Sequence, residues 1–190
     1  MMGLFGGSFD PVHHGHLIVA QVARERLGLE ELRFVPAREQ PFKRGRHQSS
    51  AEHRVAMLGL ALAGEPRFAL EQAELSRPAP SYTVDTLEEL RRRDPGRPLV
   101  LLLGSDAAAD LPAWYQAERL TELARIVVFS RPGVEVPVSR WVSEVIEVPV
   151  IDISATEVRR RVRERRSVRY WVPEPVAEYI SAHRLYLDPE

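Results

Sequence analysis

The chain has 190 residues, of which 44% are hydrophobic and 28% are charged, a composition typical of a folded globular protein rather than a disordered one. Its formal net charge of −1 excludes a globally basic nucleic-acid binder. Without cysteine there is no disulfide framework, and no apolar run approaches the roughly 20 residues that a membrane-spanning helix needs. With no leader-like segment at the N-terminus, we expect a single cytoplasmic domain over residues 1–190 that has no membrane partner.

Short apolar segments alternate with helical patterns along the chain. We expect strands at 2–5, 32–35, 68–70, 99–103, 126–129 and 145–151, and helices at 16–27, 49–63, 82–93, 154–165 and 175–183. The segment 99–103 is apolar throughout, which is typical of a central parallel strand covered on both faces. The alternation predicts an α/β fold: a doubly wound, mostly parallel, Rossmann-like sheet with helices on both faces.

A sheet of this kind binds ligands outside the carboxyl ends of its strands. Four loops are expected there, beginning at Gly6, Pro36, Gly104 and Ile153. The second of these loops carries Lys43, the only lysine among 26 basic residues. We therefore expect these loops to carry residues that take part in the chemistry.

The first loop has the composition of a phosphate-binding turn. Small residues at 6–8 leave backbone N–H groups open to an anion, and a helix that starts near Gly15 would point its positive end at the same place. The imidazoles of His13 and His16 flank that glycine. We expect this turn to bind phosphate groups.

Two motifs resemble the signatures of the nucleotidylyltransferase superfamily. These are H-x-G-H at residues 13–16 and I-S-x-T-x-x-R at residues 153–159, whereas the P-loop and the dinucleotide-binding glycine motif are missing. Within the superfamily the chain is similar to the bacterial nicotinate mononucleotide adenylyltransferases over nearly its whole length, including residues 80–83, 103–106, Trp114 and 130–133. One departure is Q-P-F-K at 40–43, where those relatives usually carry P-P-H-K, so Phe42 replaces their histidine.

The resemblance implies adenylyl transfer from ATP to nicotinate mononucleotide in NAD biosynthesis, giving nicotinate adenine dinucleotide and pyrophosphate. The phosphate of the mononucleotide is itself the nucleophile, so the reaction needs no nucleophile from the protein, and the sequence offers neither a cysteine nor a G-x-S-x-G serine. The protein would therefore contribute to catalysis by positioning the substrates and by stabilising charge. The catalytic residues implied are His13, His16, Lys43 and Arg159. Mg²⁺ would be carried mainly by ATP, without a metal site formed by the protein alone.

The other site residues implied divide between the two substrates. For ATP they are Gly6, Gly7, Ser8, Phe9, Gly15, Gly104, Asp106, Ile153, Ser154 and Thr156; for the mononucleotide they are Ser81, Tyr82, Thr83, Asp106 and Trp114. Trp114 offers a face on which the pyridine ring can stack, and Thr83 offers a donor to its carboxylate. Asp106 has two open roles, as acceptor for ribose hydroxyls or as a residue approaching Mg²⁺.

Alternative interpretations attach to the same residues. Asp10 with His13, His14 and His16 has the composition of a metal site, although His14 is expected to point away. Residues 154–157 also form a plain capping box, and the arginine-rich run 159–166 is either a solvated helix face or an RNA-binding surface.

The alternatives for the whole chain are a related adenylyltransferase acting on nicotinamide mononucleotide or phosphopantetheine, and a non-catalytic nucleotide- or RNA-binding module. We expect ATP and nicotinate mononucleotide as partners and no nucleic acid. A homo-oligomer is compatible with the sequence.

Overall fold

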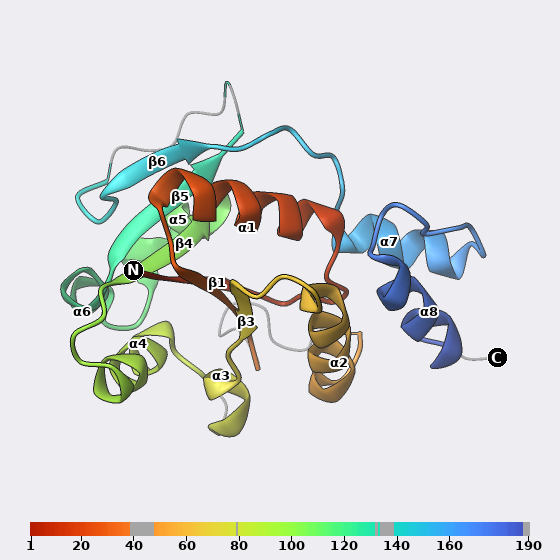
Figure 1. The fold of residues 1–190 in the computed structure, drawn as a ribbon, viewed down its shortest axis with the longest axis horizontal. Helices are drawn as coiled ribbons and strands as arrows, with labels where there is room; N and C mark the ends of the chain where they lie inside the picture. Colours follow the sequence, from red (N-terminus) through yellow and green to blue (C-terminus); the bar gives the residue numbers. More distant parts are fainter. Residues whose placement is uncertain (39–47, 79, 132, 134–138, 188–190) are drawn as a thin grey trace.

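The computed structural model describes residues 1–38, 48–78, 80–131, 133 and 139–187. In this part of the chain, six strands form one sheet in the order β3-β2-β1-β4-β5-β6 (Figure 1). Each neighbouring pair of strands is parallel, so the sheet is wholly parallel and not just mostly so. The doubly wound α/β fold predicted from the sequence is confirmed.

The strands are β1 (Met2–Gly7), β2 (Glu31–Pro36), β3 (Phe68–Leu70), β4 (Leu99–Gly104), β5 (Arg125–Ser130) and β6 (Glu144–Glu147). All six expected strands are present, although the last is shorter than the predicted 145–151. Pro149 has no N–H with which to continue the ladder beyond this point.

The helices are α1 (His14–Leu27), α2 (Ala51–Leu62), α3 (Ala73–Ser76), α4 (Thr83–Arg93), α5 (Ser105–Asp110), α6 (Ala117–Leu123), α7 (Ala155–Arg163) and α8 (Glu174–Ala182), with a 3₁₀ turn, η1 (Leu111–Ala113). The five expected helices are confirmed, and Gly28 ends α1 in the left-handed conformation, with φ 61°. The sequence did not predict α3, α5 and α6. With 4, 6 and 7 residues, these helices are too short for a 3.6-residue period to be read.

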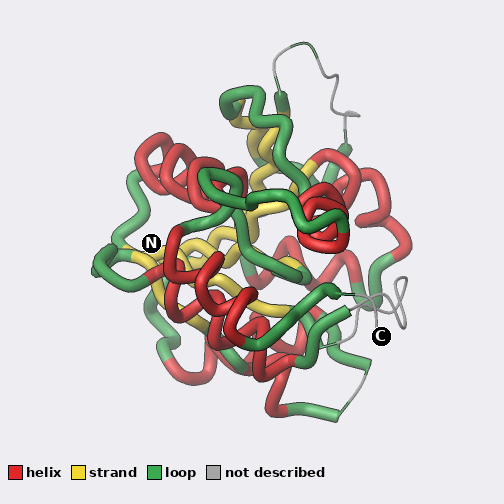
Figure 2. The backbone as a smooth tube through the Cα atoms, turned by 90° about the vertical axis from the view of Figure 1, so that its right-hand side faces the viewer, coloured by secondary structure: helices red, strands yellow, loops and turns green. Residues whose placement is uncertain are grey.

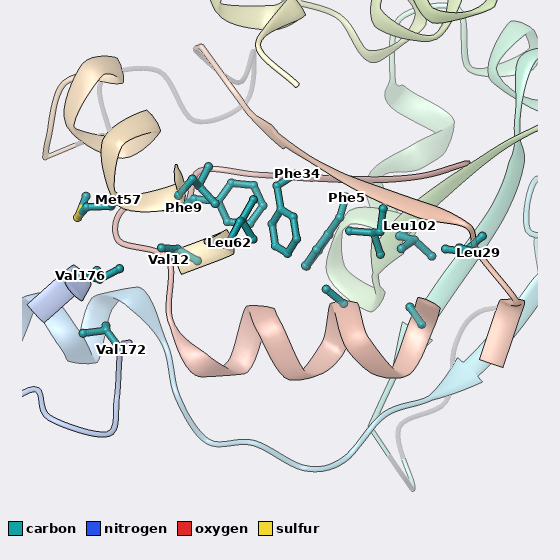
Figure 3. Close-up of a cluster of buried hydrophobic side chains, with 14 of the residues drawn as sticks. Phe5, Phe9, Val12, Leu29, Phe34, Met57, Leu62, Leu102, Val172 and Val176 are labelled. Carbon is teal, nitrogen blue, oxygen red and sulfur yellow. The ribbon is translucent and has the colours of Figure 1, made fainter. Parts of the chain in front are cut away.

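Helices cover both faces of the sheet (Figure 2). Successive side chains of β1 point to opposite faces, so Phe5 lies in one hydrophobic core while Met2 and Leu4 lie in the other. The first core is formed with α1, α2, α7 and α8, and Figure 3 shows its aromatic rings between α1 and the sheet. The second core is formed with α4, η1 and α6. This double coverage explains why residues 99–103 are apolar throughout.

Strands β2 and β3 are added on one side of β1, and strands β4 to β6 on the other. Strand β1 pairs with β2 on one side, with Gly7 opposite Pro36, and with β4 on the other, with Phe5 opposite Leu102. The carboxyl ends of β1, β2 and β4 therefore meet at one edge of the sheet, where doubly wound folds bind their ligands.

Candidate active site

The phosphate loop, here defined as residues 8–13, connects β1 to α1. Gly6 and Gly7 belong to the end of β1 and not to the loop, which corrects the sequence-based prediction. A Cβ atom on Gly7 would lie 2.9 Å from Cζ of Phe9, so the chain needs a glycine there. The ring of Phe9 is only 1% exposed and lies in the first core. The ring of Phe9 therefore packs in the core and is not available at the loop surface.

The two imidazoles of the H-x-G-H motif lie face to face. The rings of His13 and His16 are stacked with centroids 3.7 Å apart, and the backbone N–H of His13 donates to Nδ1 of His16 at 3.2 Å. Burial lowers the pKa of His13 to about 4 and that of His16 well below its usual 6.5, with each histidine's neighbouring imidazole adding to the effect. Both rings are neutral at pH 7, and since Nδ1 of His16 accepts, its proton is on Nε2.

Gly15 brings the two signature motifs together. A Cβ atom on this residue would lie 3.0 Å from Nδ1 of His13 and 3.5 Å from the carbonyl oxygen of Ile153. Ile153 precedes α7, whose N-terminus is capped by the Ser154 hydroxyl accepting the N–H of Glu157 at 3.2 Å, so the predicted cap is confirmed. The helix starts of α1 and α7 thus lie side by side, as expected.

Arg159 links the second motif to the first. Its Nη1 donates to the backbone carbonyl of Asp10 at 2.7 Å, and its Nη2 donates to the hydroxyl of Thr156 at 3.3 Å. In the described part of the chain, Nε of Arg159 and Nδ1 of His13 are buried without a hydrogen-bond partner. Buried polar atoms of this kind are costly.

Asp10 and Arg54 hold the phosphate loop in place through hydrogen bonds. The carboxylate of Asp10 accepts the N–H of Gln48 at 2.7 Å and the hydroxyls of Ser49 and Tyr186. Nη1 of Arg54 donates to the carbonyls of Ser8 at 2.9 Å and Ala37 at 2.8 Å.

The structural roles of Asp10 and Arg54 were not predicted from the sequence, from which Asp10 was proposed only as a metal ligand. One signal was present for Arg54, because it shares the inward face of α2 with Met57 and Leu58, a stripe that is otherwise apolar.

Lys43 lies outside the described residues. The residues that flank its segment are held by the contacts already given, because the carbonyl of Ala37 accepts from Arg54 and the N–H of Gln48 donates to Asp10. Arg38 also donates to the carbonyls of Leu75 and Arg77.

Gly104 and Asp106 lie at the edge of the sheet beside the phosphate loop. The predicted loop after Gly104 is absent, because β4 runs directly into α5. Asp106 therefore stands in the first turn of α5 and is exposed. A Cβ atom on Gly104 would lie 3.3 Å from the ring of Phe129, a contact that favours glycine here.

Three of the residues predicted for the mononucleotide lie at the start of α4, and Trp114 follows η1. Tyr82 is the N-cap and Thr83 the first residue of this helix, while the hydroxyl of Ser81 is buried and accepts from Arg77 at 3.4 Å. Tyr82 and Trp114 are both partly buried against the second core. The ring of Tyr82 packs against Tyr115 with centroids 4.5 Å apart, a partner that sequence analysis did not identify.

The alternative interpretations find little support in the geometry. No group of three or more potential ligands is arranged for a metal ion among the described residues. His14 instead lines a groove of about 610 Å³ with residues such as Val172 and Glu178, and its N–H donates to the carbonyl of Trp171.

The arginines of α7 make contacts within the chain. Arg160 pairs with Glu157 and Glu164, and the guanidinium of Arg161 lies 4.8 Å from the ring centroid of Trp171. These contacts favour a structural helix over an RNA-binding surface. No described helix is long and apolar enough to cross a bilayer.

Comparisons with known proteins identify the family and the fold. The model of the cytidylyltransferase-like family matches residues 4–161. A probable nicotinate-nucleotide adenylyltransferase of Thermus thermophilus is 48% identical over 97% of this chain and 98% of its own. One of Thermomicrobium roseum is 47% identical over 97% and 91%. The solved structure of a Plasmodium falciparum nicotinic acid mononucleotide adenylyltransferase complexed with NaAD superposes with a TM-score of 0.76 at 18% identity, covering 97% of this chain and 96% of that one.

Proposed function

The chain belongs to the cytidylyltransferase-like family and, within it, to the nicotinate-nucleotide adenylyltransferases, and from this premise we propose how its own residues carry out adenylyl transfer. In this reaction the phosphate oxygen of nicotinate mononucleotide attacks the α-phosphorus of ATP. The bond from that phosphorus to the bridging oxygen breaks, and pyrophosphate leaves. The products are nicotinate adenine dinucleotide and pyrophosphate, in NAD biosynthesis.

His13 and His16 act as neutral hydrogen-bond donors to the phosphates of ATP. The observation that carries this proposal is the stacked imidazole pair at the N-terminus of α1, with Nδ1 of His16 accepting a backbone N–H. That bond leaves Nε2–H as the donor of His16. A donor fixed in advance stabilises charge that develops in the transition state without reorganising.

Cationic and backbone groups complete the ATP site. Arg159, held against the carbonyl of Asp10, and Lys43 offset phosphate charge. The end of β1, the phosphate loop and the two helix starts supply N–H groups, which is the role we give to Gly6, Gly7, Ser8, Phe9, Gly15, Ile153, Ser154 and Thr156. Gly104, at the end of β4, is assigned to the same ATP site.

The mononucleotide occupies the side of α4 and η1. Its electron-poor pyridine ring stacks on Trp114 together with Tyr82, while Ser81 and Thr83 position its carboxylate. Because Tyr82 and Tyr115 are in contact, we add Tyr115 to the aromatic surface of this side.

Mg²⁺ fits the donors that are present. The ion takes one or two protein carboxylates and otherwise phosphate and water oxygens, and Asp106 offers an exposed carboxylate at the correct edge of the sheet. Bound with ATP, Mg²⁺ would neutralise part of the phosphate charge. Asp106 approaches it or accepts the ribose hydroxyls.

We place this activity in the cytoplasm, in a chain that acts as one domain over residues 1–190. The absence of cysteine fits a reducing compartment. ATP and nicotinate mononucleotide are its partners, without nucleic acid, and a homo-oligomer is compatible with this proposal.

The test is pyrophosphate release from ATP with a panel of acceptors: nicotinate mononucleotide, nicotinamide mononucleotide and phosphopantetheine. We expect the highest kcat/KM with nicotinate mononucleotide. A higher value with either of the other acceptors would replace the proposed substrate, and no release with any of them would refute the enzymatic function.

A further inference from the structure

We propose that Tyr186, close to the C-terminal end of the chain, is a positioning residue for the phosphate loop that acts through the carboxylate of Asp10. This inference rests on the adenylyl transfer described above. It assigns a role to a residue that belongs to neither signature motif and lies 176 positions from Asp10 in the sequence.

The contact is buried and specific. The hydroxyl of Tyr186 donates to Oδ1 of Asp10 at 2.8 Å, and the hydroxyl of Ser49 donates to the same oxygen. Tyr186 is 7% exposed, Asp10 2% and Ser49 8%. Hydrogen bonds to an ionised group are shorter and stronger than neutral ones, and a buried acceptor that loses its donor is costly.

Asp10 connects this contact to the groups that bind phosphate. Its side chain accepts from Tyr186, while its own carbonyl accepts Nη1 of Arg159 at 2.7 Å. His13 follows three residues later at the end of the same loop. A rotation of Asp10 would therefore move Arg159 and the start of the H-x-G-H motif together.

The backbone of Tyr186 has a conformation that residues other than glycine rarely adopt. Its φ is 64°, in the left-handed region, and such strain persists only where the surroundings over-determine it. Burial beside Asp10 also raises the pKa of the phenol, so the hydroxyl remains a donor across the physiological range. Both facts indicate that the fold maintains this hydroxyl against Asp10.

Tyr179 provides a matched control. Its hydroxyl bonds Nδ1 of His53 at 3.0 Å and so also joins the C-terminal region to α2. The change Tyr179→Phe removes one hydroxyl, as Tyr186→Phe does, but it breaks no contact with Asp10.

The experiment measures pyrophosphate release by the full chain, with saturation curves for both substrates, in the wild type, Y186F, Y179F, D10N and the double variant D10N/Y186F. Misplacing a reacting group by 1 Å can lower a rate about a hundredfold. Loss of one hydrogen bond to Asp10 should move the phosphate loop by less than this, so we expect Y186F to lower kcat about tenfold. We expect the KM for nicotinate mononucleotide to stay within about twofold, and Y179F to resemble the wild type. Because Tyr186 acts through Asp10, adding Y186F to D10N should cost no further activity, which is the non-additivity of coupled residues.

Equal kcat values for Y186F and Y179F, or losses in D10N and Y186F that multiply in the double variant, would overturn the inference. Thermal melts establish that each variant is folded at the assay temperature. Should Y186F be unfolded there, all five proteins are compared at a lower temperature at which it is folded, and the same outcomes apply. An inactive wild type would instead refute the proposed function.

Discussion

The two halves of the candidate site are built differently. The phosphate half, comprising Asp10, His13, His16, Arg54 and Arg159, is tied together by hydrogen bonds, and its residues Asp10, His13 and Arg54 are at most 6% exposed. The acceptor half consists of Ser81, Tyr82, Thr83, Asp106, Trp114 and Tyr115. Ser81 is buried and accepts a hydrogen bond from Arg77. The others lie at helix starts and turns, and Tyr115 is 51% exposed. In the proposed assignment, the groups that would stabilise charge are thus held by hydrogen bonds before a ligand arrives, whereas most groups that would select the acceptor have fewer hydrogen bonds to hold them.

The largest effect is expected from His16→Ala in the phosphate half. Loss of a preorganised donor costs about 2.7–4 kcal/mol of transition-state stabilisation, so kcat/KM should fall about a hundredfold to a thousandfold. His14→Ala is the control, because His14 lines the groove beside α8 and should retain nearly full activity. Steady-state pyrophosphate release checks both variants. A loss below about tenfold in H16A, and likewise in H13A, would remove the proposed role of the imidazoles.

An intermediate effect is expected from Gly15→Ala. The new Cβ would lie 3.0 Å from Nδ1 of His13, so the ring must shift, and kcat should fall about tenfold or more. Gly59→Ala is the control, because no atom lies within 4 Å of a Cβ atom there. Because alanine favours a helix more than glycine does, Gly59→Ala in α2 should raise the free energy of unfolding by about 1 kcal/mol and leave kcat unchanged. Denaturant titration and the kinetic assay measure these effects, and full activity in G15A would show that the imidazole position does not matter.

The smallest effect is expected in the acceptor half, from Trp114→Phe. A smaller ring stacks less well, and aromatic pairs are worth about 0.5–1.5 kcal/mol, so the KM for nicotinate mononucleotide should rise a few-fold while kcat stays close to its original value. Trp141→Phe, which alters another tryptophan of the second core, should leave that KM unchanged. A fall in kcat at constant KM would place Trp114 with the fixed groups instead.

Local sequence patterns predicted most of the fold. Short apolar segments and 3.6-residue patterns were sufficient for all six strands and the five longer helices, and the central strand of residues 99–103 was recognisable because it is apolar throughout. The short helices α5 and α6 were missed because each offers fewer than two full turns of pattern and Pro112 lies between them.

The candidate site was predictable only where its residues are close in sequence. The juxtaposition of the two signature motifs was expected, and the contact of Gly15 with Ile153 confirms it. The supporting role of Asp10 was missed because its partners Ser49 and Tyr186 are 39 and 176 positions away, and no local period records such contacts. Only Arg54 carried a signal, as a charge on an apolar helix face.

The bond between Arg159 and Asp10 spans 149 positions. A nascent chain leaves the ribosome from its N-terminus, so β1 and its glycines emerge long before α7, the helix that completes the proposed ATP site. Nucleotide binding should therefore develop late in biosynthesis, once α7 has been translated and packed, and truncated translation products should lack it.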